Sequence, residues 1–124
     1  MLIKSIYFND LLPIWRERLW QNRHSAIEPN SAMVYNQPDV YDIGNMSTKP
    51  TFFGLYYAGA IIGVNSGHAC TDGSYRSRGL WVLPTARGRG YGTKLLLATI
   101  EQGRSEGCSF VWSYPRKTSW SAYQ

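Results

Sequence analysis

A glycine-rich turn between two apolar runs is the feature that most constrains how this chain can fold. The run 79–83 stands before the turn, and the run 95–100 stands after it. A short apolar run, a cluster of glycines and a second apolar run predict a strand, a tight turn and a helix. The residues of the turn are Arg87, Gly88, Arg89, Gly90, Tyr91, Gly92 and Thr93.

The composition of this turn is typical of an anion-binding site. Glycines at three alternating positions remove side chains, so that several backbone N–H groups can converge on one anion. The helix that follows adds the free N–H groups of its N-terminus and the positive end of its dipole. Arg87 and Arg89 supply charge-assisted donors for phosphate oxygens. The turn therefore predicts a site for a phosphate or a diphosphate group.

The composition of the whole chain indicates one folded domain with a basic surface. Its 124 residues are 44% hydrophobic and 15% aromatic, which suits a single domain with a core and argues against disorder. The 13 Lys and Arg residues exceed the 8 Asp and Glu residues, which gives a formal net charge of +5. This charge favours an anionic partner but does not distinguish a nucleotide cofactor from a nucleic acid or an acidic protein.

The sequence predicts a soluble, cytoplasmic protein without a metal site. Cys70 and Cys108 lie far apart, with no CxxC pair and no His at metal-ligand spacing, so we expect two buried thiols rather than a disulfide or a zinc site. Residues 1–8 lack the apolar core of a signal peptide. No apolar run approaches the ~18 residues that a membrane-spanning helix needs.

Short apolar segments bounded by turn signals predict the remaining elements. We expect strands over 2–8, 51–57, 60–68, 75–83 and 108–112, helices over 11–20 and 31–35, the helix after the glycine turn, and the start of a helix over 119–124. Asn9 or Asp10 caps the first helix in this interpretation, and Pro13 falls in its first turn. Most of the segment 21–50 reads as a loop over a binding site.

This order of elements predicts an α/β (mixed α+β) fold. The strands 51–57, 60–68 and 75–83 form an antiparallel meander, because turns separate them. The helix after the glycine turn then carries the chain to a strand that lies parallel to the last strand of the meander. The result is a mixed sheet with helices on both faces.

The order of elements and the glycine turn resemble the GNAT superfamily of N-acetyltransferases. The signature of that family at the pyrophosphate of acetyl-CoA is Q/R-x-x-G-x-G/A, and Arg87, Gly90 and Gly92 match its specified positions. The flanking segments 81–84 (WVLP) and 92–96 (GTKLL) also match the family pattern. The resemblance is strongest over 51–124, whereas residues 1–50 match only in the order of elements. It implies a single acetyltransferase domain over residues 1–124.

The resemblance implies acetyl-CoA as the donor and an amine as the acceptor. The amides of the turn would hold the pyrophosphate, and the pantetheine arm would pair with the backbone of Leu80, Trp81 and Val82. The amine would attack the thioester carbonyl directly, in the gap between the strands that carry Leu80 and Phe110. Tyr123 occupies the place of the tyrosine that often protonates the departing thiolate in this family.

The chain departs from the family pattern in two respects. It stops at Gln124, where the family continues with the rest of a helix and a closing hairpin. We therefore expect either a truncated domain without its C-terminal strands or a site completed by another subunit, as in a homodimer. In addition, Arg76 stands where some members carry a glutamate. Because a cation cannot accept a proton, the base must be another residue or a water chain, or the amine must arrive deprotonated.

Several alternatives stay open at the level of sequence. His68 is a candidate general base, although a surface or hydrogen-bonded structural histidine is commoner. Arg76 and Arg78 share one face of their strand, which is either solvated or suited to an acidic acceptor. The chain as a whole could also be an acyl-CoA-binding remnant without catalysis, or a basic nucleic-acid-binding module in which arginine, glycine and tyrosine contact bases. A single copy of the Arg-Gly motif between a strand and a helix argues against nucleic acid.

Overall fold

A mixed sheet lies at the centre of the molecule. The computed structural model describes residues 2–21, 50–70 and 73–112. These residues form a five-stranded sheet in the order β1-β2-β3-β4-β5. The first four strands are antiparallel neighbours, and β5 runs parallel to β4. The strands are β1 Leu2–Ile6, β2 Thr51–Tyr57, β3 Ala60–Ala69, β4 Ser74–Val82 and β5 Phe110–Trp112. The predicted α/β fold is confirmed.

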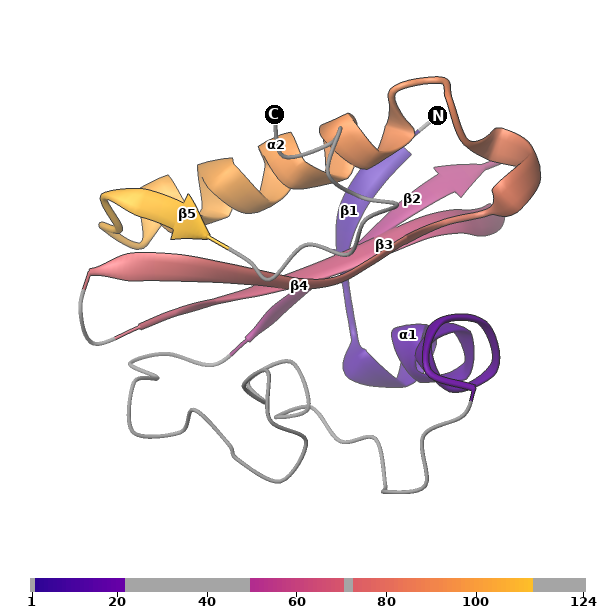
Figure 1. Cartoon of the computed structure of the whole chain (residues 1–124), viewed down its shortest axis with the longest axis horizontal. Helices are drawn as coiled ribbons and strands as arrows, with labels where there is room; N and C mark the ends of the chain where they lie inside the picture. The colour runs from indigo at the N-terminus through magenta and orange to yellow at the C-terminus, as the bar shows by residue number, and fades with distance from the viewer. Residues whose placement is uncertain (1, 22–49, 71–72, 113–124) are drawn as a thin grey trace.

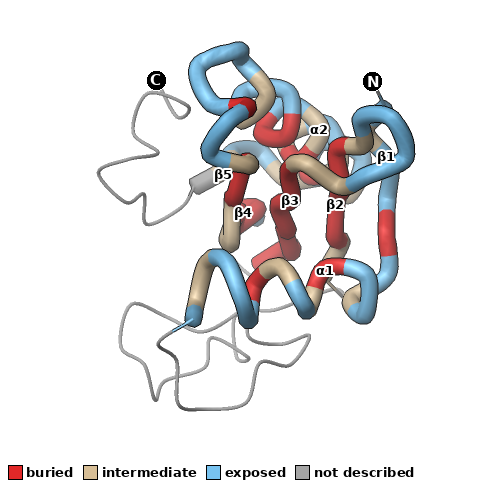
Figure 2. The backbone as a smooth tube through the Cα atoms, turned by 90° about the vertical axis from the view of Figure 1, so that its right-hand side faces the viewer, coloured by how far each residue is buried: buried red, intermediate tan, exposed pale blue. Residues whose placement is uncertain are grey.

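Helices cover the two faces of this sheet. Helix α2 (Tyr91–Ser105) lies on one face, and α1 (Phe8–Ile14), continued by the π-helical turn η1 (Trp15–Leu19), lies on the other (Figure 1). Buried residues concentrate in β2, β3 and β4 between these helices (Figure 2). Since neighbouring strand residues point to opposite faces, two separate cores result. The α1-side core contains Ile6, Leu11, Trp15, Phe52, Val64 and Trp81, and the α2-side core contains Phe53, Leu55, Val82, Ala86 and Leu95.

The first helix begins earlier than the sequence predicts. Strand β1 ends at Ile6, and α1 starts at Phe8 after the N-cap residue Tyr7, so the cap is neither Asn9 nor Asp10. Asp10 instead occupies the third helical position, where its carboxylate accepts a hydrogen bond from the Tyr7 amide at 3.2 Å. Pro13 consequently lies inside the helix rather than in its first turn. Proline has no N–H to donate and crowds the preceding turn of a helix. Helix α1 ends one residue after Pro13, at Ile14, and the chain continues as the π-helical turn η1.

Local turn geometry explains why the meander and the second helix are predicted well. Ala58 and Gly59 join β2 to β3 with φ values of 51° and 83°, the geometry that two-residue hairpins favour. Helix α2 ends at Ser105, followed by Gly107 with a φ of 85°. The amides of Gly107 and Cys108 bond back to the carbonyls of Arg104 and Gly103, at 3.0 and 2.9 Å. This arrangement is a Schellman motif, which closes a helix with glycine.

Three predicted segments lie outside the described residues. They are most of the loop 21–50, the short helix over 31–35, and the start of a helix over 119–124. Tyr123 lies there as well.

Candidate active site

The glycine turn leads into a helix N-terminus whose N-cap residue, Gly90, has no side chain to cap it. Gly88 and Gly90 both have a φ of 80°, and a Cβ atom at either position would meet nothing within 4 Å. Glycine is thus required here by backbone conformation and not by crowding. Gly90 is the N-cap of α2, and the first helical hydrogen bond runs from the Lys94 amide to the Gly90 carbonyl at 3.1 Å. The amides before Lys94 therefore face outward without intrahelical partners.

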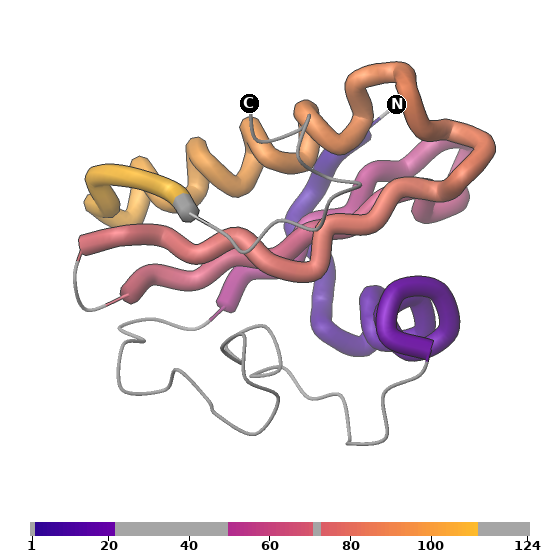
Figure 3. The backbone as a smooth tube through the Cα atoms, in the orientation of Figure 1, coloured from indigo at the N-terminus to yellow at the C-terminus, as the bar shows by residue number. Residues whose placement is uncertain are grey.

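The charges around this N-terminus are positive. Arg87, Arg89 and Lys94 are exposed, and the first turn of α2 contains no acidic residue. Thr93 is exposed as well, whereas Tyr91 is half-buried against the α2-side core. The chain leaves β4, turns back beyond the end of the sheet and enters α2, so that the turn stands at one end of the molecule (Figure 3). Amides without intrahelical partners, the positive end of a helix dipole and exposed cations are the features of an anion cradle (residues 87–93), and the binding of a diphosphate here stays a prediction.

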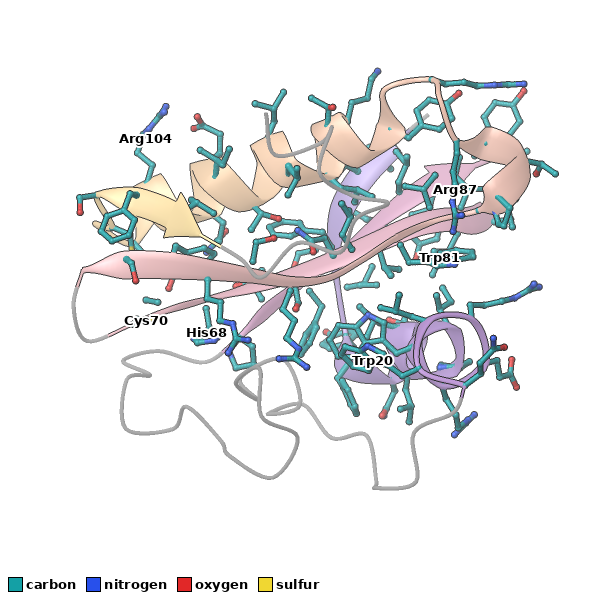
Figure 4. The ribbon with its side chains drawn as sticks, viewed as in Figure 1. Trp20, His68, Cys70, Trp81, Arg87 and Arg104 are labelled. Atoms are coloured by element: carbon teal, nitrogen blue, oxygen red, sulfur yellow. The ribbon has the colours of Figure 1, made fainter. Side chains whose placement is uncertain are left out.

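Arg87 ties this cradle to the end of β4. Its Nε atom donates a hydrogen bond to the carbonyl oxygen of Val82 at 2.8 Å. Figure 4 shows the Arg87 side chain reaching from the turn back toward the strand. The cradle and the end of β4 are consequently fixed relative to each other.

Beyond Arg76, β4 pairs with only one strand among the described residues. Its pairing with β5 ends at Arg76 and Trp112, whereas its pairing with β3 continues to Val82 and Gly63. The segment 77–82 therefore has one edge that no described strand covers. Leu80, Trp81 and Val82, the predicted contacts of the pantetheine arm, all lie in this segment.

A β-bulge interrupts β4 within the same segment. Val64 pairs with Trp81 and Ser66 pairs with Arg78, so that Asn65 alone opposes Gly79 and Leu80. Gly79 has a φ of 81°, in the left-handed region. Such a bulge bends a strand and disrupts its ladder. The bulge was not predicted, although an isolated glycine in an apolar strand was a signal for one.

Trp15 holds the bulge from the α1 side. Its Nε1 atom donates a hydrogen bond to the carbonyl oxygen of Gly79 at 3.0 Å, and its side chain is fully buried. A Cβ atom on Gly79 would lie 2.4 Å from the indole ring. Gly79 is thus required both by its φ angle and by the approach of Trp15.

A buried polar cluster joins α2 to the two central strands. Asn65 on β3 donates from Nδ2 to the Ser77 hydroxyl at 2.8 Å and to the Thr99 hydroxyl at 2.9 Å. Thr99 in turn donates to the Leu95 carbonyl at 2.9 Å. All three polar residues are fully or almost fully buried. Because Thr99 belongs to α2, the cluster fixes the helix that carries the cradle against the strand that carries the bulge.

The opposite face of the sheet carries a second group of polar side chains. His68 and Arg76 are cross-strand neighbours, and both are buried, with 0% and 1% of their surfaces exposed. The expectation of a solvated strand face is therefore wrong for Arg76. Arg78 lies two residues further along β4, with its guanidinium 5.3 Å from the centre of the Trp20 ring. His68 and Trp20 both point away from α2 (Figure 4).

The structure places His68 on the face of the sheet opposite the helix that carries the anion cradle. His68 Nδ1 lies 3.3 Å from the Ala69 carbonyl oxygen and 4.0 Å from Cys70 Sγ. The cradle belongs to α2, on the other side of the sheet. The predicted state of the thiols is confirmed for Cys70, which is free and buried, whereas Cys108 is free but only half-buried.

Two further features were searched for in the described part of the chain, a metal-binding cluster and a membrane-spanning helix. Residues 2–21, 50–70 and 73–112 contain no group of three His, Cys, Asp or Glu side chains that could hold a metal ion. No helix in these ranges is long and apolar enough to cross a membrane.

A glycine-capped helix N-terminus next to a strand end with one edge that no described strand covers is the arrangement expected of an acyl-CoA-dependent acyltransferase. The sequence matches the model of the acetyltransferase (GNAT) family over residues 13–124. The chain therefore belongs to this family. A comparison with the sequences of curated proteins found no match.

Solved structures show the same fold. A predicted acetyltransferase from Clostridium acetobutylicum, determined with acetyl-CoA, is 12% identical with a TM-score of 0.67, and the match covers 98% of this chain and 85% of that one. Glucosamine-6-phosphate N-acetyltransferase from Arabidopsis thaliana is 14% identical with a TM-score of 0.63, covering 98% and 86%. An aminoglycoside acetyltransferase from an uncultured soil metagenomic sample, in complex with sisomicin, is 17% identical with a TM-score of 0.62, covering 98% and 82%.

Proposed function

We propose that this protein is an N-acetyltransferase that transfers an acetyl group from acetyl-CoA to a primary amine. The observation that carries the proposal is that the N-terminus of α2, whose N-cap is Gly90, follows the end of β4, where one edge of the strand is covered by no described strand. If the diphosphate of acetyl-CoA binds at the N-terminus of α2, the pantetheine arm of the same molecule lies beside this edge of β4. Membership of the family supports the transfer of an acyl group from acyl-CoA. That the acyl group is acetyl and that the acceptor is a primary amine are our proposals.

The donor would be held mainly by backbone groups. The amides between Gly88 and Thr93 would bind the diphosphate oxygens, with Arg87 and Arg89 adding charge. The backbone of Leu80, Trp81 and Val82 would pair with the pantetheine amides in the manner of an added strand. The Val82 carbonyl already accepts a bond from Arg87. A carbonyl oxygen has two lone pairs, so it can accept a second bond from the donor molecule.

The transfer would proceed by direct attack of the amine. The nitrogen lone pair forms a bond to the thioester carbonyl carbon, the carbon–sulfur bond breaks, and the thiolate of CoA leaves. The proton lost by the amine balances the proton gained by the thiolate. We propose that Tyr123 donates the proton to the thiolate, and that His68 is a candidate for the base that accepts the proton from the amine. Tyr123 lies outside the described residues, and His68 lies on the face opposite α2.

We also propose that the enzyme works in the cytoplasm. Both cysteines, Cys70 and Cys108, are free thiols in the structure. A reducing compartment keeps thiols in this state.

The direct test is the thermal shift produced by acetyl-CoA. Saturating acetyl-CoA should raise the melting temperature of the wild-type protein, because a ligand that binds only the folded state stabilises it. Arg87→Glu should remove most of the shift. The matched control is Arg104→Glu, which makes the same charge change at the exposed C-terminal end of α2 and should keep the shift. No shift in the wild-type protein would refute the proposal.

The thermal shift, combined with a measurement of thiol release, separates the two alternative functions. A remnant without catalysis would show the acetyl-CoA shift but release no thiol with any amine. A nucleic-acid-binding module would be stabilised by an oligonucleotide instead, with an affinity that falls steeply as the salt concentration rises.

A further inference from the structure

One peptide unit of β4, the unit that joins Gly79 to Leu80, is held from the α1 side of the sheet. Its carbonyl oxygen, which belongs to Gly79, accepts a hydrogen bond from Trp15 Nε1 at 3.0 Å. The peptide bond is trans, so its N–H, which belongs to Leu80, points in the direction opposite to the carbonyl oxygen. The N–H of Leu80 is therefore directed away from Trp15.

The alternation of backbone groups along the strand directs the same N–H to the uncovered edge of β4. The Leu83 amide donates to the Ile62 carbonyl oxygen at 2.8 Å, so the backbone of Leu83 faces β3. In an antiparallel pair, the backbone groups of successive residues point alternately toward the neighbouring strand and away from it. The amide of Trp81 accordingly faces β3, and the amide of Leu80 faces the edge that no described strand covers.

This edge is where the proposed function places the thioester of the donor. The turn 87–93 would hold the diphosphate, and the pantetheine arm would run along residues 80–82, away from the turn. Leu80 lies farthest from the turn in this segment, so its N–H lies toward the thioester end of the arm. When the amine attacks the thioester, the carbonyl oxygen gains negative charge, and an N–H directed at that oxygen stabilises it.

The orientation of this peptide unit is not fixed by the strand itself. Gly79 has a φ of 81°, and a residue without a Cβ atom lets the adjoining peptide turn at little steric cost. The bulge also interrupts the pairing with β3, where Asn65 alone opposes Gly79 and Leu80. The hydrogen bond from Trp15 supplies the constraint that a regular ladder would otherwise provide.

Trp15 is held firmly enough to impose this constraint. Its side chain is fully buried, and its ring packs edge-to-face against Phe8 and Phe52, with centroid distances of 6.4 and 6.0 Å. A Cβ atom on Gly79 would lie 2.4 Å from the indole ring, so the ring lies directly against the strand backbone. Close packing in a core keeps a side chain in one rotamer, which fixes the direction of the indole N–H.

We infer that Trp15 is a positioning residue of the acyl transfer. By binding the Gly79 carbonyl, it holds the Leu80 N–H toward the uncovered edge of β4, where this N–H donates to the carbonyl oxygen of the bound thioester. Because Trp15 is fully buried, it acts through the strand backbone. The inference rests on the proposed function and adds to its site a residue from the opposite face of the sheet.

The test measures how much the thioester carbonyl contributes to binding, which requires no acceptor amine. Acetyl-CoA is compared by isothermal titration with S-ethyl-CoA, in which a methylene group replaces the carbonyl. The wild-type protein should bind acetyl-CoA roughly three- to tenfold more tightly, the effect of one hydrogen bond.

Variants assign this preference to Trp15. Trp15→Phe should remove the preference while leaving the affinity for S-ethyl-CoA unchanged. The carbonyl stretch of bound, isotope-labelled acetyl-CoA should also move to a higher infrared frequency than in the wild-type complex, because the oxygen loses its donor. Replacement of Trp15 by benzothienylalanine, whose ring has nearly the same shape with sulfur in place of the N–H, should have the same two effects with less loss of packing.

Ile6→Val is the matched control, because it removes a methyl group from the same α1-side core on a different element. It should keep both the preference for acetyl-CoA and the infrared frequency of the wild-type complex.

Equal affinities for acetyl-CoA and S-ethyl-CoA in the wild-type protein would overturn this inference and leave the proposed function standing. An undiminished preference in both Trp15 variants would also overturn it. Equal weakening of both compounds in these variants would overturn it too, since the residue would then only stabilise the fold. Failure of the wild-type protein to bind either compound would overturn the proposed function, and this inference with it.

Discussion

The indole Nε1 of Trp15 donates a hydrogen bond to the backbone carbonyl oxygen of Gly79 across 3.0 Å. This bond joins the π-helical turn on one face of the sheet to the bulge of β4. The bulge lies in the segment where β4 is no longer covered by β5. A contact between residues sixty-four positions apart thus shapes the strand edge on which the proposed acyl-CoA site depends.

Gly79→Ala should be strongly destabilising. The new Cβ atom would lie 2.4 Å from the Trp15 ring, and the backbone would keep a left-handed φ that alanine adopts with strain. We expect a loss of about 3 kcal/mol or more in the free energy of unfolding, measured by urea denaturation. Gly59→Ala is the matched control, because its φ is 83° but nothing lies within 4 Å of its Cβ position. It should cost only about 1 kcal/mol, and equal losses in the two variants would contradict the role given to Trp15.

Trp15→Phe should show how much the hydrogen bond from Trp15 to Gly79 contributes to the free energy of unfolding. Phenylalanine keeps an aromatic ring in the α1-side core but leaves the Gly79 carbonyl without its donor. We expect a loss of about 1–3 kcal/mol, which combines the missing bond with the smaller ring. Trp20→Phe is a comparison at a half-buried position and should cost less. The two denaturation curves can be measured under identical conditions, and a larger loss for Trp20→Phe would count against this interpretation.

Gly103→Ala should destabilise a helix that alanine would normally strengthen. In an open helix position the change gains up to about 1 kcal/mol. Here a Cβ atom would lie 2.8 Å from Cγ of Tyr75, which packs against α2 at this point. We expect a net loss of about 1–3 kcal/mol. In a Tyr75→Ala background the same substitution should cost less, and a double-mutant cycle with no coupling would disprove the contact.

Tyr75 should make the stability fall in alkaline solution. Burial, the largest cause, raises the pKa of Tyr75 well above its usual value of 10.0, and the Glu106 carboxylate raises it further, against an opposing hydrogen bond from Thr51. Its hydroxyl donates to Glu106 at 2.9 Å. The unfolded chain therefore releases this proton first, near pH 10, so the contribution of Tyr75 to stability is complete below that pH and is lost as the pH rises above it.

The measurement is the free energy of unfolding as a function of pH between about 8 and 11. Tyr75→Phe should flatten the alkaline decline. Tyr57→Phe, at an exposed tyrosine, is the control and should leave the decline unchanged. An equally steep decline in wild type and Tyr75→Phe would show that the group titrates normally.

Features encoded in adjacent residues could be predicted from the sequence. Local backbone conformation determines three of them: the hairpin turn at Ala58 and Gly59, the glycine turn before α2, and the end of α2 at Gly107. The period of apolar residues then assigns strands and helices. The mixed sheet follows, because these local elements leave few ways to arrange the connections.

Features decided by distant contacts could not be predicted. The bulge depends on Gly79 meeting Trp15, and the cluster of Asn65, Ser77 and Thr99 requires three separate elements to meet. The burial of Arg76 depends on what covers one face of the sheet, which alternation along a strand does not reveal. The start of α1 was misjudged because Asp10 serves at the third helical position as well as it would serve as a cap.

The central claim is that the turn from Arg87 to Thr93 binds the diphosphate of an acyl-CoA. Isothermal titration with acetyl-CoA and with S-acetylpantetheine tests it most directly, because the two thioesters share the reactive end and only acetyl-CoA carries the diphosphate, together with the adenosine 3′-phosphate attached to it. Several charge-assisted bonds to the diphosphate should make acetyl-CoA bind at least roughly a hundredfold more tightly. Equal affinities for the two compounds would contradict the claim.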